Sequence, residues 1–214
     1  MQERDARSAL LTVLTTEHYN LQSQRIATIG EANGRASIFL GAVSAGLIAL
    51  GFAFGAGRSS AEVISYAVVV LGALAFLGVV TMARCQQSSM DDVALAARID
   101  RIRAAYASTV PESASLEEEI RGAEGAFRGI GLRRDMQMLL TVAGSVSVVT
   151  ALLVGGCAAL AVFGVVRSLA ESLIVGFVVF TSAEVASVLL QKNGWKRFNA
   201  AEITRDCGAA RERR

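Results

Sequence analysis

Proline, histidine and recognisable catalytic motifs are scarce or missing in this sequence. The 214 residues include one Pro and one His, and only 6% of them are aromatic. The motifs of zinc proteases (H-E-x-x-H), of serine hydrolases (G-x-S-x-G) and of P-loop nucleotide-binding proteins do not occur. These absences argue against an enzyme, and the sequence predicts no catalytic residue, no metal site and no cofactor.

Cysteine is also sparse, and charge is nearly balanced. Cys85, Cys157 and Cys207 are too widely spaced for a disulfide framework or a zinc site. The formal net charge is only +2, and the basic residues are not interleaved with aromatic ones as they are in many nucleic-acid-binding surfaces. The first 20 residues lack the basic, apolar and small-residue regions of a secretory signal. We therefore expect no nucleic-acid partner and no cleaved leader.

Long apolar runs are abundant. Apolar residues make up 53% of the chain, and four runs reach the roughly 20 residues that a membrane-spanning helix needs. They cover about 36–56, 62–83, 138–166 and 172–190. The 20 glycines suit helices that pack closely in lipid. The sequence predicts an all-α integral membrane protein with four transmembrane helices.

The distribution of Arg and Lys predicts how these spans are oriented. Nineteen of the 21 basic residues lie before the first span, between the second and third, or after the fourth. Cytoplasmic segments of membrane proteins carry such an excess of Arg and Lys. We therefore expect a multi-pass protein of the cell inner (plasma) membrane, with both termini and the middle segment in the cytoplasm. The expected interfacial anchors, in contact with membrane lipid, are Arg35, Arg84, Arg133, Arg134, Lys192, Trp195, Lys196 and Arg197.

A nine-residue sequence pattern occurs twice, once before the second span and once before the fourth. FGAGRSSAE at 54–62 and FGVVRSLAE at 163–171 share six of nine positions. Each contains S-x-x-E, the pattern of a capping box at the start of a helix. The repetition predicts two parallel two-span units. The expected outer caps are Arg58, Ser59, Glu62, Arg167, Ser168 and Glu171.

The remaining segments read as cytoplasmic helices and a tail. Asn33-Gly34 predicts a turn or kink after a first amphipathic helix, and Asp91-Asp92 predicts the start of a second one. Gly122, Gly125 and Gly129 favour close contact or flexing in a third. The predicted division is a cytoplasmic helix (1–34), a two-span unit (35–84), a cytoplasmic helical hairpin (85–136), a second two-span unit (137–191) and a basic tail (192–214).

Glu184 is the only charged residue that interrupts a span. An acid facing lipid at this depth is penalised, so the side chain is expected to face protein or water, or to stay protonated. Thr141 and Ser145 on the third span lie at a similar depth and could donate hydrogen bonds to it, and Thr181 flanks it. Glu184, Thr181, Thr141 and Ser145 form a candidate ion or proton path; alternatively, Glu184 only holds the fourth span to the third.

Residues 15–44, TTEHYNLQSQRIATIGEANGRASIFLGAVS, resemble the N-terminal part of uncharacterised bacterial four-span membrane proteins. The layout of a cytoplasmic helix, spans and further cytoplasmic helices is loosely similar to that of SLATT proteins. Those are two-span modules proposed to form pores in bacterial defence, and this likeness implies a pore-forming role.

The leading interpretation is an oligomeric channel or pore, cation-conducting and gated by its cytoplasmic helices. Small residues at 144, 147, 151, 155 and 158 offer a packing face within or between subunits, and we expect a homo-oligomer. The alternative is a membrane scaffold or signalling protein that docks a soluble cytoplasmic partner. A secondary transporter ranks third, because no span contains a Pro at which the helix would break.

Overall fold

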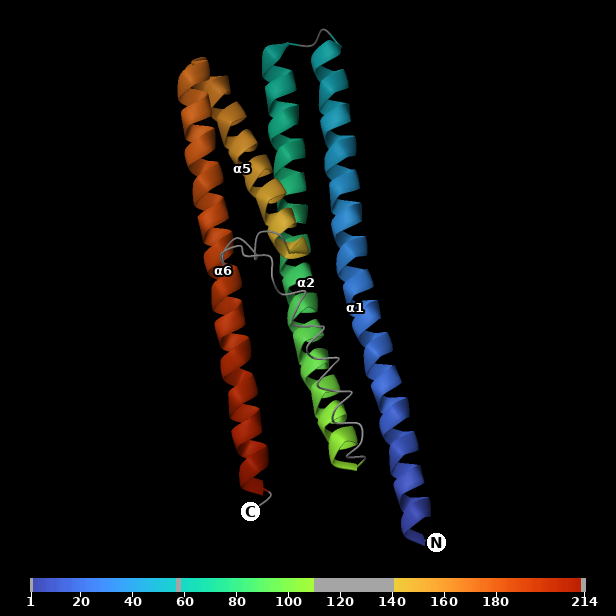
Figure 1. Ribbon diagram of the computed structural model, residues 1–214. Helices are drawn as coiled ribbons and strands as arrows, with labels where there is room; N and C mark the ends of the chain where they lie inside the picture. Colours follow the sequence, from blue (N-terminus) through green and yellow to red (C-terminus); the bar gives the residue numbers. More distant parts are fainter. Residues whose placement is uncertain (1, 57–58, 110–140, 213–214) are drawn as a thin grey trace, which may run out of the picture. The chain divides into compact units, whose positions relative to one another are not determined.

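Four long α-helices form the described part of the chain in the computed structural model (Figure 1). The structure describes the backbone of residues 2–56, 59–109 and 141–212, and the side chains of 5–56, 59–109 and 141–198. The helices are α1 (Gln2–Gly55), α2 (Ser60–Thr109), α5 (Val142–Val166) and α6 (Leu169–Glu212). Each is long and apolar enough to cross a membrane, and the described residues include no strand. The predicted all-helical chain with four candidate spans is confirmed.

Two predicted helix boundaries are wrong. α1 stays helical through Asn33-Gly34, and α2 runs without a break through Asp91-Asp92. A single Gly costs a helix about 1 kcal/mol, which is too little to end one that is packed on either side of it. No Gly or Pro lies between Ala83 and Asp91, so nothing in the sequence ends α2 there. The Asp pair lies inside the helix, where Asp92 forms an ion pair with Arg25.

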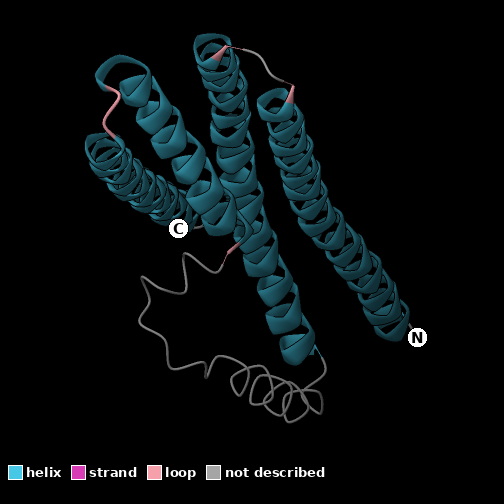
Figure 2. Cartoon of the chain, turned by 90° about the horizontal axis from the view of Figure 1, so that it is seen from above, coloured by secondary structure: helices cyan, strands magenta, loops and turns pink. Residues whose placement is uncertain are grey.

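The two hairpin turns are short, and both are followed by a Ser that caps the next helix. The Ser59 hydroxyl accepts a hydrogen bond from the Glu62 backbone N–H at 3.4 Å, and Ser168 accepts one from Glu171 at 3.5 Å. Between α5 and α6, Arg167 adopts φ 60°, and its backbone N–H donates to the Phe163 carbonyl. This left-handed residue ends α5 and lets the chain reverse within two residues. Figure 2 shows the short loop that joins these two helices.

The chain divides into two compact units. Unit 1 comprises Met1–Glu31 and Ser88–Gln137, and unit 2 comprises Ala32–Gln87 and Met138–Arg214. In unit 1 the buried side chains of Leu21, Leu95 and Ile99 form an apolar cluster between α1 and α2. The Arg25 guanidinium pairs with Asp92 at 2.6 Å beside this cluster. Unit 1 therefore has an apolar seam between its two helices and an ion pair beside that seam.

Unit 2 contains the larger core. Its buried side chains come from α1, α2 and α5 and include Phe39, Leu71 and Val146. Gly78 lies where these three helices meet, because a Cβ added there would collide with the Thr150 hydroxyl and would come within 2.9 Å of the Phe39 ring. A side chain at residue 78 would therefore separate the helices.

The crossing of α5 and α6 within unit 2 is equally close. A Cβ on Gly155 would lie 2.7 Å from the Gly176 carbonyl oxygen, and a Cβ on Gly176 would lie 2.8 Å from Ala159. Small residues allow helix backbones to approach in this way, and such contacts drive helix association in lipid. The stripe of small residues on α5 is thus used within the chain: its buried members are Gly144, Ser147, Ala151 and Gly155.

Candidate functional site

The face of α6 that packs into unit 2 is polar and small. Ser172, Gly176, Ser187 and Gln191 are buried on it, and Glu184 is half-buried between them. The large apolar side chains of α6 are exposed instead, among them Leu173, Ile174, Phe177, Val185 and Leu190. A helix that buries polar groups and exposes apolar ones is suited to lipid rather than to water, because lipid cannot satisfy hydrogen bonds.

Glu184 faces α5, where it meets Ser147. The Ser147 hydroxyl lies 3.1 Å from Glu184 Oε1 and 3.4 Å from Oε2, and the Ser147 side chain is 1% exposed. The sequence had indicated Thr141 and Ser145 as the donors, and the structure places them differently. Ser145 is exposed, and Thr141 caps α5 by accepting a hydrogen bond from the Gly144 N–H at 3.1 Å. The prediction considered only how deep each hydroxyl lies in the span and therefore missed Ser147. Which hydroxyl faces α6 depends instead on the rotation of α5 about its axis.

Thr181, the fourth predicted member of the path, does not join Glu184. Its hydroxyl lies 3.0 Å from each of the backbone carbonyl oxygens of Phe177 and Val178 and donates its one proton within α6. This bonding satisfies the hydroxyl within its own helix, as is common for Thr in transmembrane segments.

Three further polar side chains continue from Glu184 along the same unit. Ser187 Oγ contacts Met82 Sδ at 2.9 Å, and Gln191 Nε2 donates to Ser187 Oγ at 3.3 Å. Gln86 Nε2 donates to the Gln191 carbonyl oxygen at 3.2 Å. We call Ser147, Glu184, Ser187, Gln191 and Gln86 the polar cluster. The spacing of 184, 187 and 191 on one helix face was a sequence signal that could have identified it.

Cys85 lies on α2 beside the polar cluster residue Gln86, and its side chain is fully buried. Burial raises the pKa of the Cys85 thiol, and the positive charge of Arg35 opposes this shift. The thiol contacts the Ala32 carbonyl oxygen on α1 at 3.7 Å. A buried neutral thiol of this kind acts as a small packing residue. Over the described ranges, no group of three or more Cys, His, Asp or Glu side chains could hold a metal ion.

The predicted anchors are placed only in part. Arg35 and Arg84 are exposed, as are Lys196 and Arg197, while Lys192 is half-buried. Trp195 packs edge-to-face on Phe198, with ring centroids 5.9 Å apart. The predicted anchors Arg133 and Arg134, the cap residue Arg58 and the glycines at 122, 125 and 129 lie outside the described residues.

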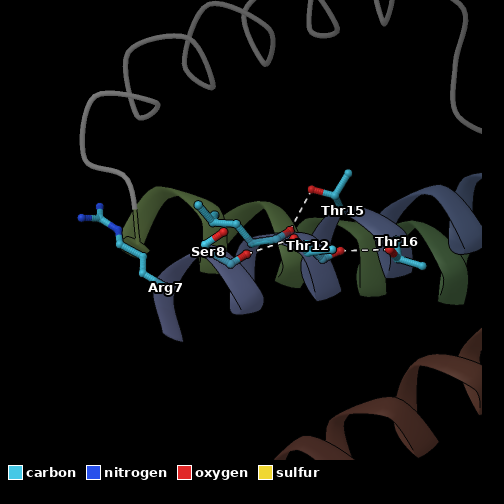
Figure 3. Close-up of a pocket in the computed structure, with 6 residues that line it drawn as sticks. Arg7, Ser8, Thr12, Thr15 and Thr16 are labelled. Atoms are coloured by element: carbon cyan, nitrogen blue, oxygen red, sulfur yellow. Dashed lines mark hydrogen bonds between the residues drawn. The ribbon is translucent and has the colours of Figure 1, made fainter. Parts of the chain in front are cut away.

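Unit 1 has an open groove along α1, and its three threonines are bonded to the backbone of α1 (Figure 3). Thr12, Thr15 and Thr16 each donate to a backbone carbonyl four residues earlier, at 2.8 to 3.0 Å. Arg7 donates to the Thr109 carbonyl, and Tyr106 donates to the Thr15 hydroxyl. Several polar side chains of the groove are thus bonded within unit 1, and we take the polar cluster of unit 2 as the candidate site.

Together, the fold and the polar cluster define a class: an all-helical chain with four candidate membrane spans and polar side chains turned into its apolar part. No protein-family model, curated protein or solved structure matches the chain. Its function therefore has to be argued from its own residues.

Proposed function

We propose that the protein is an oligomeric channel or pore of the cell inner membrane, which conducts cations and is gated by cytoplasmic helices. The observation that carries the proposal is the polar cluster around Glu184. An acid within a membrane-spanning helix is a functional site by default. Rings of Glu carboxylates in an oligomer attract cations. Glu184 contacts Ser147 and is only half-buried, and its exposed part would face the path in the oligomer.

A homo-oligomer gains support from α1 rather than from α5. The glycines at 34, 41, 51 and 55, together with Ser37 and Ser44, follow one exposed face of α1. A Cβ added at any of these four glycines would have no atom within 4 Å. The opposite face of α1 packs into the core through Ala36, Phe39 and Val43. Since small exposed faces pair helices in lipid, we assign α1 to contacts between subunits.

The topology of the proposal has both termini and residues 85–136 in the cytoplasm and both hairpins outside. The bias of basic residues supports it. The two capped helix starts at Ser59 and Ser168 agree with two parallel two-span repeats. Gating would come from movement of the cytoplasmic helices of unit 1 against the spans.

The test is electrical recording of the purified full-length protein in planar bilayers. We expect cation-selective currents, and we expect Glu184→Gln to reduce the preference for cations over anions because the carboxylate charge is removed. Ser182→Ala, an exposed neighbour on α6, is the matched control and leaves selectivity unchanged. Bilayers that stay silent while native mass spectrometry finds intact oligomers would contradict the channel.

A scaffold that docks a soluble protein is the second candidate. Val13, Tyr19 and Ile26 on α1 of unit 1 are 64%, 72% and 70% exposed, which is unusual for apolar and aromatic side chains outside a bilayer. Crosslinking in cells followed by purification should then recover a soluble protein in a fixed ratio. Substitution of all three residues by Ser would abolish the recovery, and an unchanged recovery would exclude this surface.

A further inference from the structure

One exposed face of α6 is apolar over most of its length and cationic at its end. Val178, Val185 and Leu189 are spaced seven and four residues apart, so they share one side of the helix. Their exposed fractions are 55%, 60% and 55%. Lys192 and Lys196 continue the same side of the helix, three and seven residues after Leu189. Lys192 is half-buried and Lys196 is exposed.

The two lysines lie at the depth where lipid headgroups meet the hydrocarbon. α6 begins at Leu169, directly after the hairpin turn. At 1.5 Å per residue, Lys192 lies about 35 Å along the helix, slightly more than the hydrocarbon thickness of about 30 Å. With the hairpin at one surface of the bilayer, Lys192 therefore reaches the opposite surface. Lys196 lies about 6 Å further along, among the headgroups.

The charge at this end of unit 2 is of one sign. Between 191 and 198 the helix carries three basic residues and no acid. Arg84 on α2 adds a base near the same level, because the nearby Gln86 donates to the Gln191 carbonyl oxygen at 3.2 Å. The hairpin end differs, since the two repeated segments before α2 and α6 carry two Arg and two Glu. An anion in the membrane surface is therefore attracted to the lysine end.

We propose that this face of α6 is a binding site for one anionic phospholipid of the surrounding membrane. The phosphate meets the ammonium groups of Lys192 and Lys196, and an acyl chain lies along Leu189, Val185 and Val178. An anionic phospholipid joins an apolar chain to a negative headgroup, so it matches both parts of the face. A soluble phosphate matches only the lysines. The site requires no ion conduction, so it stands apart from the proposed channel.

Trp195 provides a reporter for this site. It is the only tryptophan of the chain, and it lies between the two lysines in the sequence, packed edge-to-face on Phe198. The experiment measures its fluorescence in the full-length protein, reconstituted in phosphatidylcholine vesicles with a small fraction of lipid brominated on its acyl chains. Bromine quenches tryptophan at close contact. Brominated phosphatidylglycerol should bind beside Trp195 with a preference on the order of tenfold over brominated phosphatidylcholine.

Two double variants separate a defined site from general attraction to a basic surface. Lys192→Gln with Lys196→Gln should abolish the preference for phosphatidylglycerol. Arg84→Gln with Arg197→Gln removes the same charge at the same end but leaves both lysines, and most of the preference should remain. All four positions are exposed or half-buried, so both variants are expected to fold, and circular dichroism and elution volume verify that.

Three results would overturn the proposal. The first is equal quenching by the two brominated lipids in the unmodified protein. The second is an equal loss of preference in the two double variants, which would indicate general electrostatic attraction. The third is reversal of the preference by excess soluble glycerol phosphate, which would show that the lysines bind a free phosphate. Because quenching is recorded without current measurement, a failed lipid site and a failed channel give different results.

Discussion

The seam of unit 1 and the packed face of α6 in unit 2 bury opposite types of residue. In unit 1 the helices bury Leu21, Leu95 and Ile99 and pair Arg25 with Asp92 at the edge. In unit 2, α6 buries Ser172, Ser187 and Gln191 and exposes its large apolar side chains. In water, the burial of apolar surface stabilises a helical protein, whereas in lipid close packing and satisfied polar groups stabilise it. The seam of unit 1 is therefore apolar, whereas the packed face of α6 is polar and small.

The largest effect is expected from the core of unit 1. Ile99→Ala removes a buried side chain and should cost about 3 kcal/mol through lost apolar burial and a cavity. Hydrogen exchange measured by mass spectrometry should rise in peptides around Leu95–Ile102 and stay unchanged in α5. Val93→Ala, at an exposed position of the same helix, should have almost no effect. Equal exchange in the two variants would mean that unit 1 is not held by an apolar seam.

A smaller cost is expected where unit 2 depends on backbone contact. Gly155→Leu forces a side chain against the Gly176 carbonyl and should destabilise the protein by about 2 kcal/mol. Unfolding in mixed detergent micelles, followed by circular dichroism, measures it. Gly72→Leu is the matched control, because a Cβ at Gly72 meets nothing within 4 Å. If Gly155→Leu unfolded no earlier than Gly72→Leu, α5 and α6 would not cross at these glycines.

The smallest effect is expected from the ion pair of unit 1. Arg25 and Asp92 are 38% and 23% exposed, so Asp92→Asn should cost only about 0.5 kcal/mol. The loss should shrink in high salt because solvent-accessible charges are screened. Thermal unfolding of the purified protein at low and high salt checks this. The exposed neighbour Asp91 gives the control, since Asp91→Asn should change neither value. A loss that is independent of salt would argue that Asp92 acts through packing rather than charge.

Several features could be read from the sequence because they depend on local composition. Four apolar runs without a Pro gave four helices, and S-x-x-E at 59–62 and 168–171 marked two helix starts. The predicted boundaries at Asn33-Gly34 and Asp91-Asp92 failed, since turn-forming residues were weighed without the packing that overrides them. The middle segment from 110 to 140 lies outside the described residues, so its predicted second helix stays a prediction.

By itself, the sequence determined that the chain is helical, that four of its stretches suit a bilayer, and that an acid at 184 needs a companion. Hydropathy and helix propensity depend on residues that are neighbours in the chain, so both can be predicted from the amino-acid sequence alone. Only the tertiary structure decided that this companion is Ser147 and that Gly155 meets Gly176. Which face of a helix meets its neighbour depends on rotation about the helix axis, and many side chains from distant parts of the chain set that rotation together.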